Sequence, residues 1–579
     1  MHPVSVKLHA HLTGEEARIY VTCGIVLKYL PYLEVLYGVA YQIGKANQEL
    51  NRLPIAQTNR LLNTVVSKQE ENPFVYDKIG TRINHYMIDE FQDTSSMQWS
   101  NFLPLLLETL SRGESNMLVG DSKQSIYRWR NSQLSLLQNI NNDFKQLELS
   151  TLPSNWRSDK TIVEQNNYIF SKMAEREEQM LSEEVSVDEL DYSITAVYQD
   201  VEQRAEKLSE EGYVNIRFWE SDDKDDRNKL TIDSVLDIVR DIAERGISLG
   251  KVAILIRMNY EAVAIAEALL GAGYQVMSAA ALYLANSPEV RYVIARMKSA
   301  LTPDDKILTM EVSYLWQMLN DKNGDTQDLP TVDTLSQLPL DKPLTRLIES
   351  IISEIPSDRR LSGEVYIDAL RDLVCQYITR FNSDIYSFIS WWDESGCDSK
   401  LNMQPTADTI QITTIHKSKG LEYDIVIVPY LSWDTAKPKD KSKQNILWVK
   451  PTVAPFNMLP VLPVRFGPDL QKSLFSSDYS RELRDLYIDN LNLLYVAFTR
   501  AKRELYAFSA RCDYGKNIEL KEIGEVLHSV LNDELDENGC YIRGEKIAAQ
   551  PFPRTAEPPA FATPSSWVVP LLSDNDKKL

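Results

Sequence analysis

The sequence is poor in cysteine, and the few cysteines it has are scattered. None of the five has the paired spacing that zinc or iron–sulfur sites require, so we expect neither kind of metal centre. Unpaired thiols suit a reducing compartment, which indicates a cytoplasmic protein. The five cysteines are Cys23, Cys375, Cys397, Cys512 and Cys540.

Long apolar runs and excess positive charge are also lacking. We find no signal peptide and no run of about 18 apolar residues, and therefore predict no membrane partner. The 62 basic and 83 acidic residues give a net charge of −21, which argues against a protein that coats nucleic acid nonspecifically. Contacts with phosphates must then come from local cations. Acidic residues are concentrated at 175–191 and 222–226, which we interpret as solvated faces and linkers.

Two adjacent carboxylates follow a short apolar segment near the start of the chain. Residues 83–88 suit a buried parallel strand, which would deliver Asp89 and Glu90 to the edge of a sheet. The first carboxylate can hold Mg²⁺ there, and the second can orient or deprotonate an attacking water. An isolated pair of this kind is more often solvated surface, so the interpretation depends on the rest of the chain.

A second apolar strand is predicted at residues 117–121, and it also ends in polar residues. Two such strands indicate a parallel sheet whose carboxyl ends carry the site, with Gln124 placed to contact a phosphate. The next residues mix cations with aromatic rings, a combination that binds single-stranded nucleic acid through charge and stacking. These residues are Lys123, Tyr127, Arg128, Trp129 and Arg130. A helix with its aromatic rings in the core is the alternative.

Residues 89–95 and 119–130 resemble motifs II and III of superfamily 1 DNA helicases of the UvrD/RecB type, which include AddA-like proteins. Three further segments follow in the order that this family requires. Residues 154–158 resemble motif IV, with Trp156 where the family usually has tyrosine, residues 412–423 resemble motif V, and residues 493–502 resemble motif VI. Five long motifs in order make this resemblance specific.

The resemblance implies an α/β fold of RecA-like parallel-sheet motor lobes with helical insertions. It implies ATP and Mg²⁺ as cofactors, single-stranded and duplex DNA as partners, and a second subunit of a helicase–nuclease complex as a further candidate partner. Around the nucleotide it places Asp89 (with Mg²⁺), Glu90, Gln124, Arg157, Arg500 and, against the sugar, Glu422. On DNA it places Thr413, Thr414, His416 and Lys417 beside the residues of motif III, and the turn that includes Lys419 suits a phosphate contact. Arg157 and Arg500 would reach across a cleft to the γ-phosphate.

The Gly-rich phosphate loop of the family, G-x-x-x-x-G-K-[ST], does not occur in the sequence. The nearest segment is residues 38–46, in which five residues separate Gly38 from Gly44 and Ala46 replaces the hydroxyl. Its surroundings predict helices. We therefore expect the later part of a helicase motor with an incomplete first lobe, entered inside the helical insertion that precedes motif II. No nuclease pattern follows Lys502.

The length and a hydrophobic content of 43% predict several domains. We expect a helical insertion of the first lobe (1–78), a partial first lobe (79–151), the first part of a second lobe (152–301), its helical insertion (302–405), its return (406–512) and a partly disordered extension (513–579). Strands are predicted at 213–219 and 252–257. Trp391 and Trp392 fit helix packing better than a DNA wedge.

Two functions are compatible with these observations. The first is an ATP-dependent 3′–5′ DNA helicase or translocase acting in DNA repair or recombination. The second is a catalytically inactive helicase-like module that binds single-stranded DNA or a partner protein. The intact motifs indicate descent from an active helicase, which favours the first function. The missing phosphate loop favours the second function for this chain by itself.

Overall fold

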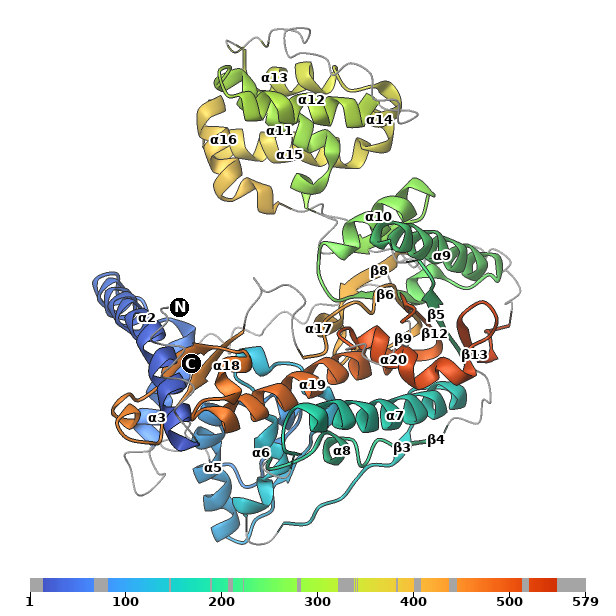
Figure 1. Ribbon diagram of the computed structural model, residues 1–579. Coiled ribbons are helices and arrows are strands. Elements are labelled where there is room, and N and C mark those ends of the chain that lie inside the picture. The colour runs from blue at the N-terminus through green and yellow to red at the C-terminus, as the bar shows by residue number, and fades with distance from the viewer. Residues whose placement is uncertain are drawn as a thin grey trace, which may run out of the picture.

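A seven-stranded, mostly parallel sheet lies at the centre of the molecule (Figure 1). Its strands follow the order β13, β5, β12, β9, β6, β8, β7, and all neighbours are parallel except β13 and β5. The strands are β5 (Gly212–Trp219), β6 (Val252–Ile256), β7 (Val276–Ser278), β8 (Ile410–Thr414), β9 (Tyr423–Val428), β12 (Ala501–Ala510) and β13 (Cys540–Glu545). The computed structural model describes residues 14–66, 82–144, 147–187, 190–206, 212–221, 223–278, 283–320, 338, 340, 342–381, 384–399, 408–436, 445–512 and 520–548.

Helices cover both faces of this sheet because its central strands are apolar on both sides. In β6, Ala253 and Leu255 pack into one core, whereas Val252, Ile254 and Ile256 pack into the other. The first core includes α7 (Lys160–Glu184), α19 (Ser476–Phe498) and α20 (Ile523–Leu531), and the second includes α9 (Lys224–Glu244) and α10 (Glu261–Gly271). This layering confirms the predicted α/β fold class, and the strands predicted at 213–219 and 252–257 are present.

The sheet uses more of the C-terminal chain than the sequence predicts. β13 adds an antiparallel edge strand beside β5, and Leu527 and Leu531 of α20 are buried in the first core. The expectation that residues after 512 form an extension outside the second lobe is therefore wrong for residues 520–548. The reason is that β13 is short and does not alternate apolar with polar residues, so only its pairing with the distant β5 places it in the sheet. The segment 550–570, predicted to be an extended linker, lies outside the described residues.

Five helices form a separate core at one end of the second lobe (Figure 1). They are α11 (Pro288–Leu301), α12 (Lys306–Asn320), α13 (Leu344–Ile352), α15 (Glu364–Arg380) and α16 (Ile385–Glu394), and the short α14 (Ser357–Ser362) precedes α15 in the chain. Because α11 packs here, this helical unit begins before residue 302, where the sequence analysis placed its start. Trp392 is buried and Trp391 packs against the same core, which confirms the packing interpretation.

The described part of the first lobe is small. Two parallel strands, β1 (Met87–Ile88) and β2 (Met117–Leu118), lie beside α5 (Ser96–Ser111) and α6 (Leu134–Gln138), and Phe91 and Trp99 pack into the local core. The prediction of a buried strand over 83–88 is wrong, because β1 has two residues and Met87 is 77% exposed. Parallel pairing with β2 nevertheless brings motifs II and III side by side.

Among the described residues before the first lobe, the chain forms α2 (Glu15–Glu49) and α3 (Ile55–Val66). Gly38 and Gly44 lie inside α2, which confirms that the segment 38–46 is helical. In the part of the chain that the structure describes, α2 is the one helix whose length and composition would allow it to cross a membrane. This finding concerns length and composition only, and it does not overturn the expectation, which concerns an uninterrupted apolar run. Lys28 and Glu34 divide its apolar residues into shorter runs, which is why inspection of the sequence alone does not predict it.

The remaining elements are short and connect the larger units. They are β3 (Ser154–Asn155), β4 (Arg204–Ala205), α8 (Ile194–Val197), α17 (Ile415–Ser418), β10 (Ile446–Val449), β11 (Leu462–Arg465) and α18 (Pro468–Gln471). The β10–β11 hairpin lies against α2, whose Arg18 Nε donates to the carbonyl of Ser473 over 3.2 Å.

Candidate functional site

Motifs II and III meet through a close backbone approach. A side chain at Gly120 would place its Cβ 2.8 Å from Oε1 of Gln92, so glycine leaves room for this amide. Gln92 is buried; its Oε1 accepts from the amide of Asp121 over 3.0 Å, and its Nε2 donates to Glu90. The two motifs are therefore joined by contacts within the protein, without a ligand.

Asp89 and Glu90 lie just after β1, as predicted. Asp89 is exposed, and its Oδ1 accepts from the amide of Glu90 over 2.8 Å. Glu90 has a left-handed backbone, with φ of 53°, which costs about 1–2 kcal/mol for a non-glycine residue. Such strain concentrates at functional positions, where the surrounding structure enforces it.

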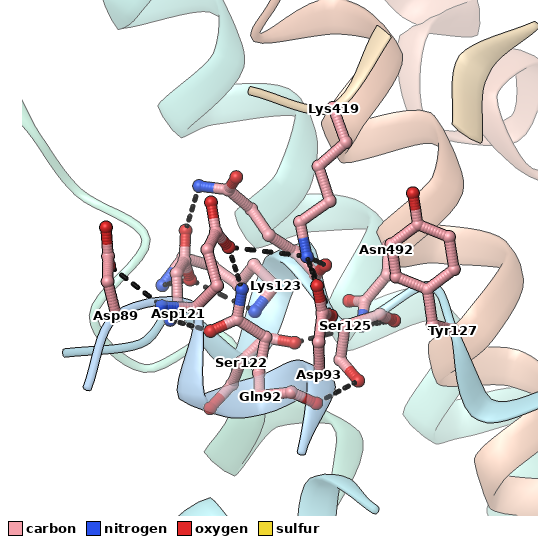
Figure 2. Close-up of polar contacts among 12 residues, drawn as sticks. Asp89, Gln92, Asp93, Asp121, Ser122, Lys123, Ser125, Tyr127, Lys419 and Asn492 are labelled. Carbon is pink, nitrogen blue, oxygen red and sulfur yellow. Dashed lines mark hydrogen bonds and ion pairs between the residues drawn. The ribbon is translucent and has the colours of Figure 1, made fainter. Parts of the chain in front are cut away.

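Lys419 is the residue that joins the two lobes at this point (Figure 2). Its Nζ lies 2.7 Å from Asp93 Oδ2, 2.8 Å from the carbonyl of Gln124 and 3.4 Å from Glu90 Oε2. Burial raises the pKa of Asp93, and the hydrogen bond from Lys419 opposes that rise. The expectation that this lysine contacts DNA phosphate is not supported, because its side chain is almost fully buried among these partners.

Two cations predicted to bind DNA have intramolecular partners instead. Lys123 is only 4% exposed, and its Nζ lies 2.9 Å from Asp121 and 3.0 Å from Asp200. Burial lowers its pKa, but these two carboxylates outweigh burial and the net effect is a raised pKa. The prediction that Lys123 contacts DNA is therefore corrected.

Arg128 also forms ion pairs within the protein. Its Nη1 lies 2.8 Å from Glu482 and its Nε 2.5 Å from Asp489, both on α19. Burial lowers the pKa of this guanidinium, but the two acids outweigh burial and raise it. Arg128 thus holds motif III against α19, and the structure gives it no free charge for DNA.

The other aromatic and basic residues of motif III form an open cluster with motif V. Trp129 is 65% exposed, and the guanidinium carbon of Arg130 lies 4.5 Å from the centre of its ring. The ring of His416 lies 6.2 Å from Trp129 and 6.0 Å from Tyr127, whose hydroxyl donates to the carbonyl of His416 over 2.9 Å. A core position is therefore excluded for Trp129, and Tyr127 is half-buried.

A groove with a volume of about 660 Å³ begins at this cluster. It is lined by Trp129, Arg257, Tyr260, His416, Trp433 and others. The sequence analysis does not identify Arg257 and Tyr260 as site residues. A signal was present for Arg257, because it directly follows the apolar run of β6, as a strand-end residue would. Burial, and then the charges of Arg257 and Arg130, lower the pKa of His416 to about 4, so its ring is neutral at pH 7.

The remaining residues predicted on the DNA side lie next to His416. Thr413 and Thr414 end β8 and are partly exposed, and Lys417 on α17 is exposed. These residues occupy the end of a central strand, where the sequence analysis expected ligand contacts.

Arg157 and Glu422 form an ion pair, a contact that the sequence analysis does not predict. Arg157 Nε lies 3.2 Å from Glu422 Oε2, and Lys502 Nζ lies 2.8 Å from the other oxygen. Lys502, and then Arg157, lower the pKa of Glu422. Gln124 donates from Nε2 to Asp121 Oδ2 over 2.9 Å, so its amide is positioned by the end of the second strand of the first lobe.

Arg500 is a buried cation without an acidic partner. It is 1% exposed and donates to the carbonyls of Val496 and Leu421, each over 3.0 Å, and to the hydroxyl of Thr499. Among the described residues no carboxylate lies within ion-pair distance of it. Burial, and then the charge of Arg157, lower its pKa to about 10. An anion such as a phosphate would relieve this charge, so the residue fits a nucleotide.

The fit to Mg²⁺ is limited to one protein ligand. In the ranges that the structure describes, no three His, Cys, Asp or Glu side chains form a group that could hold a metal. All five cysteines are free thiols in the structure. Mg²⁺ is commonly held by one or two carboxylates together with substrate phosphates, and the exposed Asp89 suits that arrangement.

Comparison with known families agrees with this geometry. The model of the UvrD/REP helicase N-terminal domain matches residues 36–145, and that of the UvrD-like helicase C-terminal domain matches residues 150–321 and 384–511, more than half of the chain. The chain belongs to the UvrD-like helicase family. Membership confirms the resemblance found in the motifs, and ATP and DNA are the ligands that this family implies.

The relatives of this UvrD-like chain include components of helicase–nuclease enzymes. The RecB subunit of the RecBCD enzyme of Haemophilus influenzae is 24% identical over 497 residues, covering 77% of this chain and 37% of that protein. RecB of Chlamydia pneumoniae is 26% identical, with coverages of 77% and 37%. An ATP-dependent helicase/nuclease subunit of Streptococcus pneumoniae is 25% identical, with coverages of 76% and 41%. The chain thus spans about two fifths of the length of the curated relatives it matches.

Proposed function

We propose that this chain forms part of an ATP-dependent helicase of the UvrD/RecB type, which moves 3′ to 5′ on single-stranded DNA and separates duplex DNA in repair or recombination in the cytoplasm. The observation that carries the proposal is the motif III segment, residues 119–130. Its Gln124 end contacts Asp121 and Lys419, next to the carboxylates of motif II, and its Trp129 end is an exposed platform. One short segment therefore joins a phosphate side to a DNA side, as a nucleotide-driven motor requires.

On the nucleotide side we assign each role to a residue whose surroundings support it. Arg157, Arg500 and Gln124 contact the γ-phosphate, and the buried guanidinium of Arg500, which has no ion-pair partner among the described residues, supports this most directly. Asp89 holds Mg²⁺ together with nucleotide phosphates, Glu90 orients the attacking water, and Glu422 lies against the sugar.

On the DNA side we assign stacking to Trp129 and Tyr127, and backbone contacts to Arg130 and to the end of β8. The polar residues there are Thr413, Thr414, His416 and Lys417. Arg257 extends this path because it lines the same groove. Lys123 and Arg128 are left out of this path, since their charges already meet carboxylates.

A second candidate is a catalytically inactive module that binds single-stranded DNA or a partner protein, such as a second subunit of a helicase–nuclease complex. One observation favours it: the sequence contains no G-x-x-x-x-G-K-[ST] loop, and its nearest approximation lies inside α2. Without that cradle the triphosphate loses several charge-assisted contacts of about 1.5–3 kcal/mol each. We therefore expect this chain alone to bind ATP weakly.

Steady-state ATPase assays with and without a single-stranded oligonucleotide, together with binding of the same oligonucleotide, test both candidates. Turnover that Asp89→Ala and Glu90→Gln abolish, with DNA binding retained, supports the enzyme. Salt-sensitive DNA binding without turnover supports the module. A chain that binds no single-stranded DNA contradicts the first candidate and the DNA-binding form of the second.

A further inference from the structure

Asn492 lies at the contact between α19 and the motif III segment (Figure 2). Its side chain is fully buried, and its Nδ2 donates to the carbonyl of Ser122 over 2.9 Å and to that of Ser125 over 3.0 Å. Its Oδ1 accepts from the hydroxyl of Tyr198 over 2.8 Å. Both amide protons and the amide oxygen are therefore used.

The two carbonyls that Asn492 binds flank Gln124. Ser122 begins a short 3₁₀ turn, Ser122–Gln124, and Ser125 directly follows it. The amide of Gln124 donates to the carbonyl of Asp121 over 3.0 Å, and that of Ser125 donates to the carbonyl of Ser122 over 3.2 Å. Without Asn492, both carbonyls would be buried with one partner fewer. Because a buried polar group without a partner costs about 1–3 kcal/mol, this amide is the main polar attachment of the turn to α19.

Arg500 closely follows the same helix. α19 ends at Phe498, so Asn492 lies six residues before the end of the helix and Arg500 two residues after it. Arg500 is folded back onto that helix by its bond to the carbonyl of Val496. Gln124 and Arg500 are thus attached to one rigid element, although they come from different lobes.

We infer that Asn492 is a positioning residue that fixes the motif III segment to α19, so that its phosphate end and its DNA end keep one geometry relative to Arg500. Asn492 itself touches neither ligand. The expected effect of Asn492 on DNA binding rests on the proposed function, because Asn492 acts through Trp129 at the far end of the segment. The attachment of the turn can be measured without any ligand.

The test compares Asn492→Leu, which keeps the side-chain volume and loses all three hydrogen bonds, with Tyr198→Phe. Tyr198→Phe is the matched control, because it removes a buried hydrogen bond to the same amide and leaves the bonds to Ser122 and Ser125. Hydrogen exchange of the amides of Gln124 and Ser125 is measured in each variant. We expect exchange about tenfold faster or more in Asn492→Leu and unchanged exchange in Tyr198→Phe. Equal exchange in the two variants overturns the inference.

A double-mutant cycle then examines the link to DNA. We expect Asn492→Leu to weaken binding of a single-stranded oligonucleotide by about tenfold, and to have little further effect in a Trp129→Ala background. Equal weakening in both backgrounds overturns the inference. A wild-type chain that binds no oligonucleotide contradicts the proposed function, and hydrogen exchange then decides the inference alone. If Asn492→Leu does not fold, Asn492→Asp, which keeps the acceptor and loses the donors, replaces it.

Discussion

Lys419 Nζ lies 2.7 Å from Asp93 Oδ2, and this contact joins motif V in the second lobe to motif II in the first. The lysine side chain is nearly buried, so the pair is only weakly screened by salt. The same ammonium lies 5.3 Å from the centre of the Tyr127 ring, at the inner edge of the DNA cluster.

Lys419→Met should destabilise the protein by about 1.5–3 kcal/mol, because it leaves the partly buried carboxylate of Asp93 without its charged donor. Urea unfolding measures the loss. Combining the substitution with Asp93→Asn should recover part of the lost stability, since position 93 then carries no unpaired charge and Glu90, which also faces Lys419, is exposed. A double variant as unstable as the sum of the two single variants would contradict this coupling.

Trp129→Ala should weaken binding of single-stranded DNA by about tenfold or more, because stacking of a base on an aromatic ring contributes roughly 1–3 kcal/mol. The melting temperature should change little, since the ring is exposed. Trp448→Ala is the matched control: Trp448 is 55% exposed on β10, outside the cluster, and its loss should leave DNA affinity unchanged. A large fall in melting temperature with unaltered affinity would show that Trp129 is a packing residue.

Arg500→Gln should abolish stabilisation by polyphosphate. Sodium tripolyphosphate should raise the melting temperature of the wild-type chain, because the buried guanidinium lacks an acidic partner among the described residues. Removal of this contact costs about 1.5–3 kcal/mol of anion binding, so the shift should disappear in the variant. Potassium chloride at equal ionic strength serves as the control, and an equal shift in wild type and variant would contradict the anion role.

Glu177→Leu should stabilise the protein, and more at pH 8 than at pH 4. Burial raises the pKa of this carboxyl well above its usual value, and among the described residues neither oxygen has a hydrogen-bond partner. An acid with a raised pKa in the folded state contributes a destabilisation that is absent below its unfolded pKa and grows as pH rises above it. Thermal melts across this range should show a difference between variant and wild type that widens with pH. A constant difference would mean that packing alone is responsible.

Sequence patterns predict β6 well, because it is an apolar run whose burial can be inferred without knowledge of distant residues. Sequence patterns fail where a side chain is bound by a residue that is distant in the sequence. Lys123 and Arg128 are visibly cationic, but Asp200 and Glu482, which bind them, come from other parts of the chain. Composition therefore shows that these side chains are charged, but it does not show which residues they bind.

Glu177 shows a second limit of sequence reasoning. It belongs to an acidic stretch that suggests a solvated face, yet helical spacing places it on the stripe of α7 that also carries Phe170, Met173, Ala174 and Leu181. The helical phase, rather than local composition, determines its burial. The same reasoning explains the success with Trp392, which lies on the inner face of α16.

The antiparallel pairing of β13 with β5 also bears on self-association. An unpaired edge strand offers a row of free N–H and C=O groups to any other chain, and β13 occupies that row on β5. Gly544 makes the pairing possible, because a Cβ there would lie 1.9 Å from the carbonyl oxygen of Gly212. A chain ending before residue 540 would therefore present an open, largely apolar strand and gain a tendency to form β-linked oligomers, independent of any effect on the ligand site.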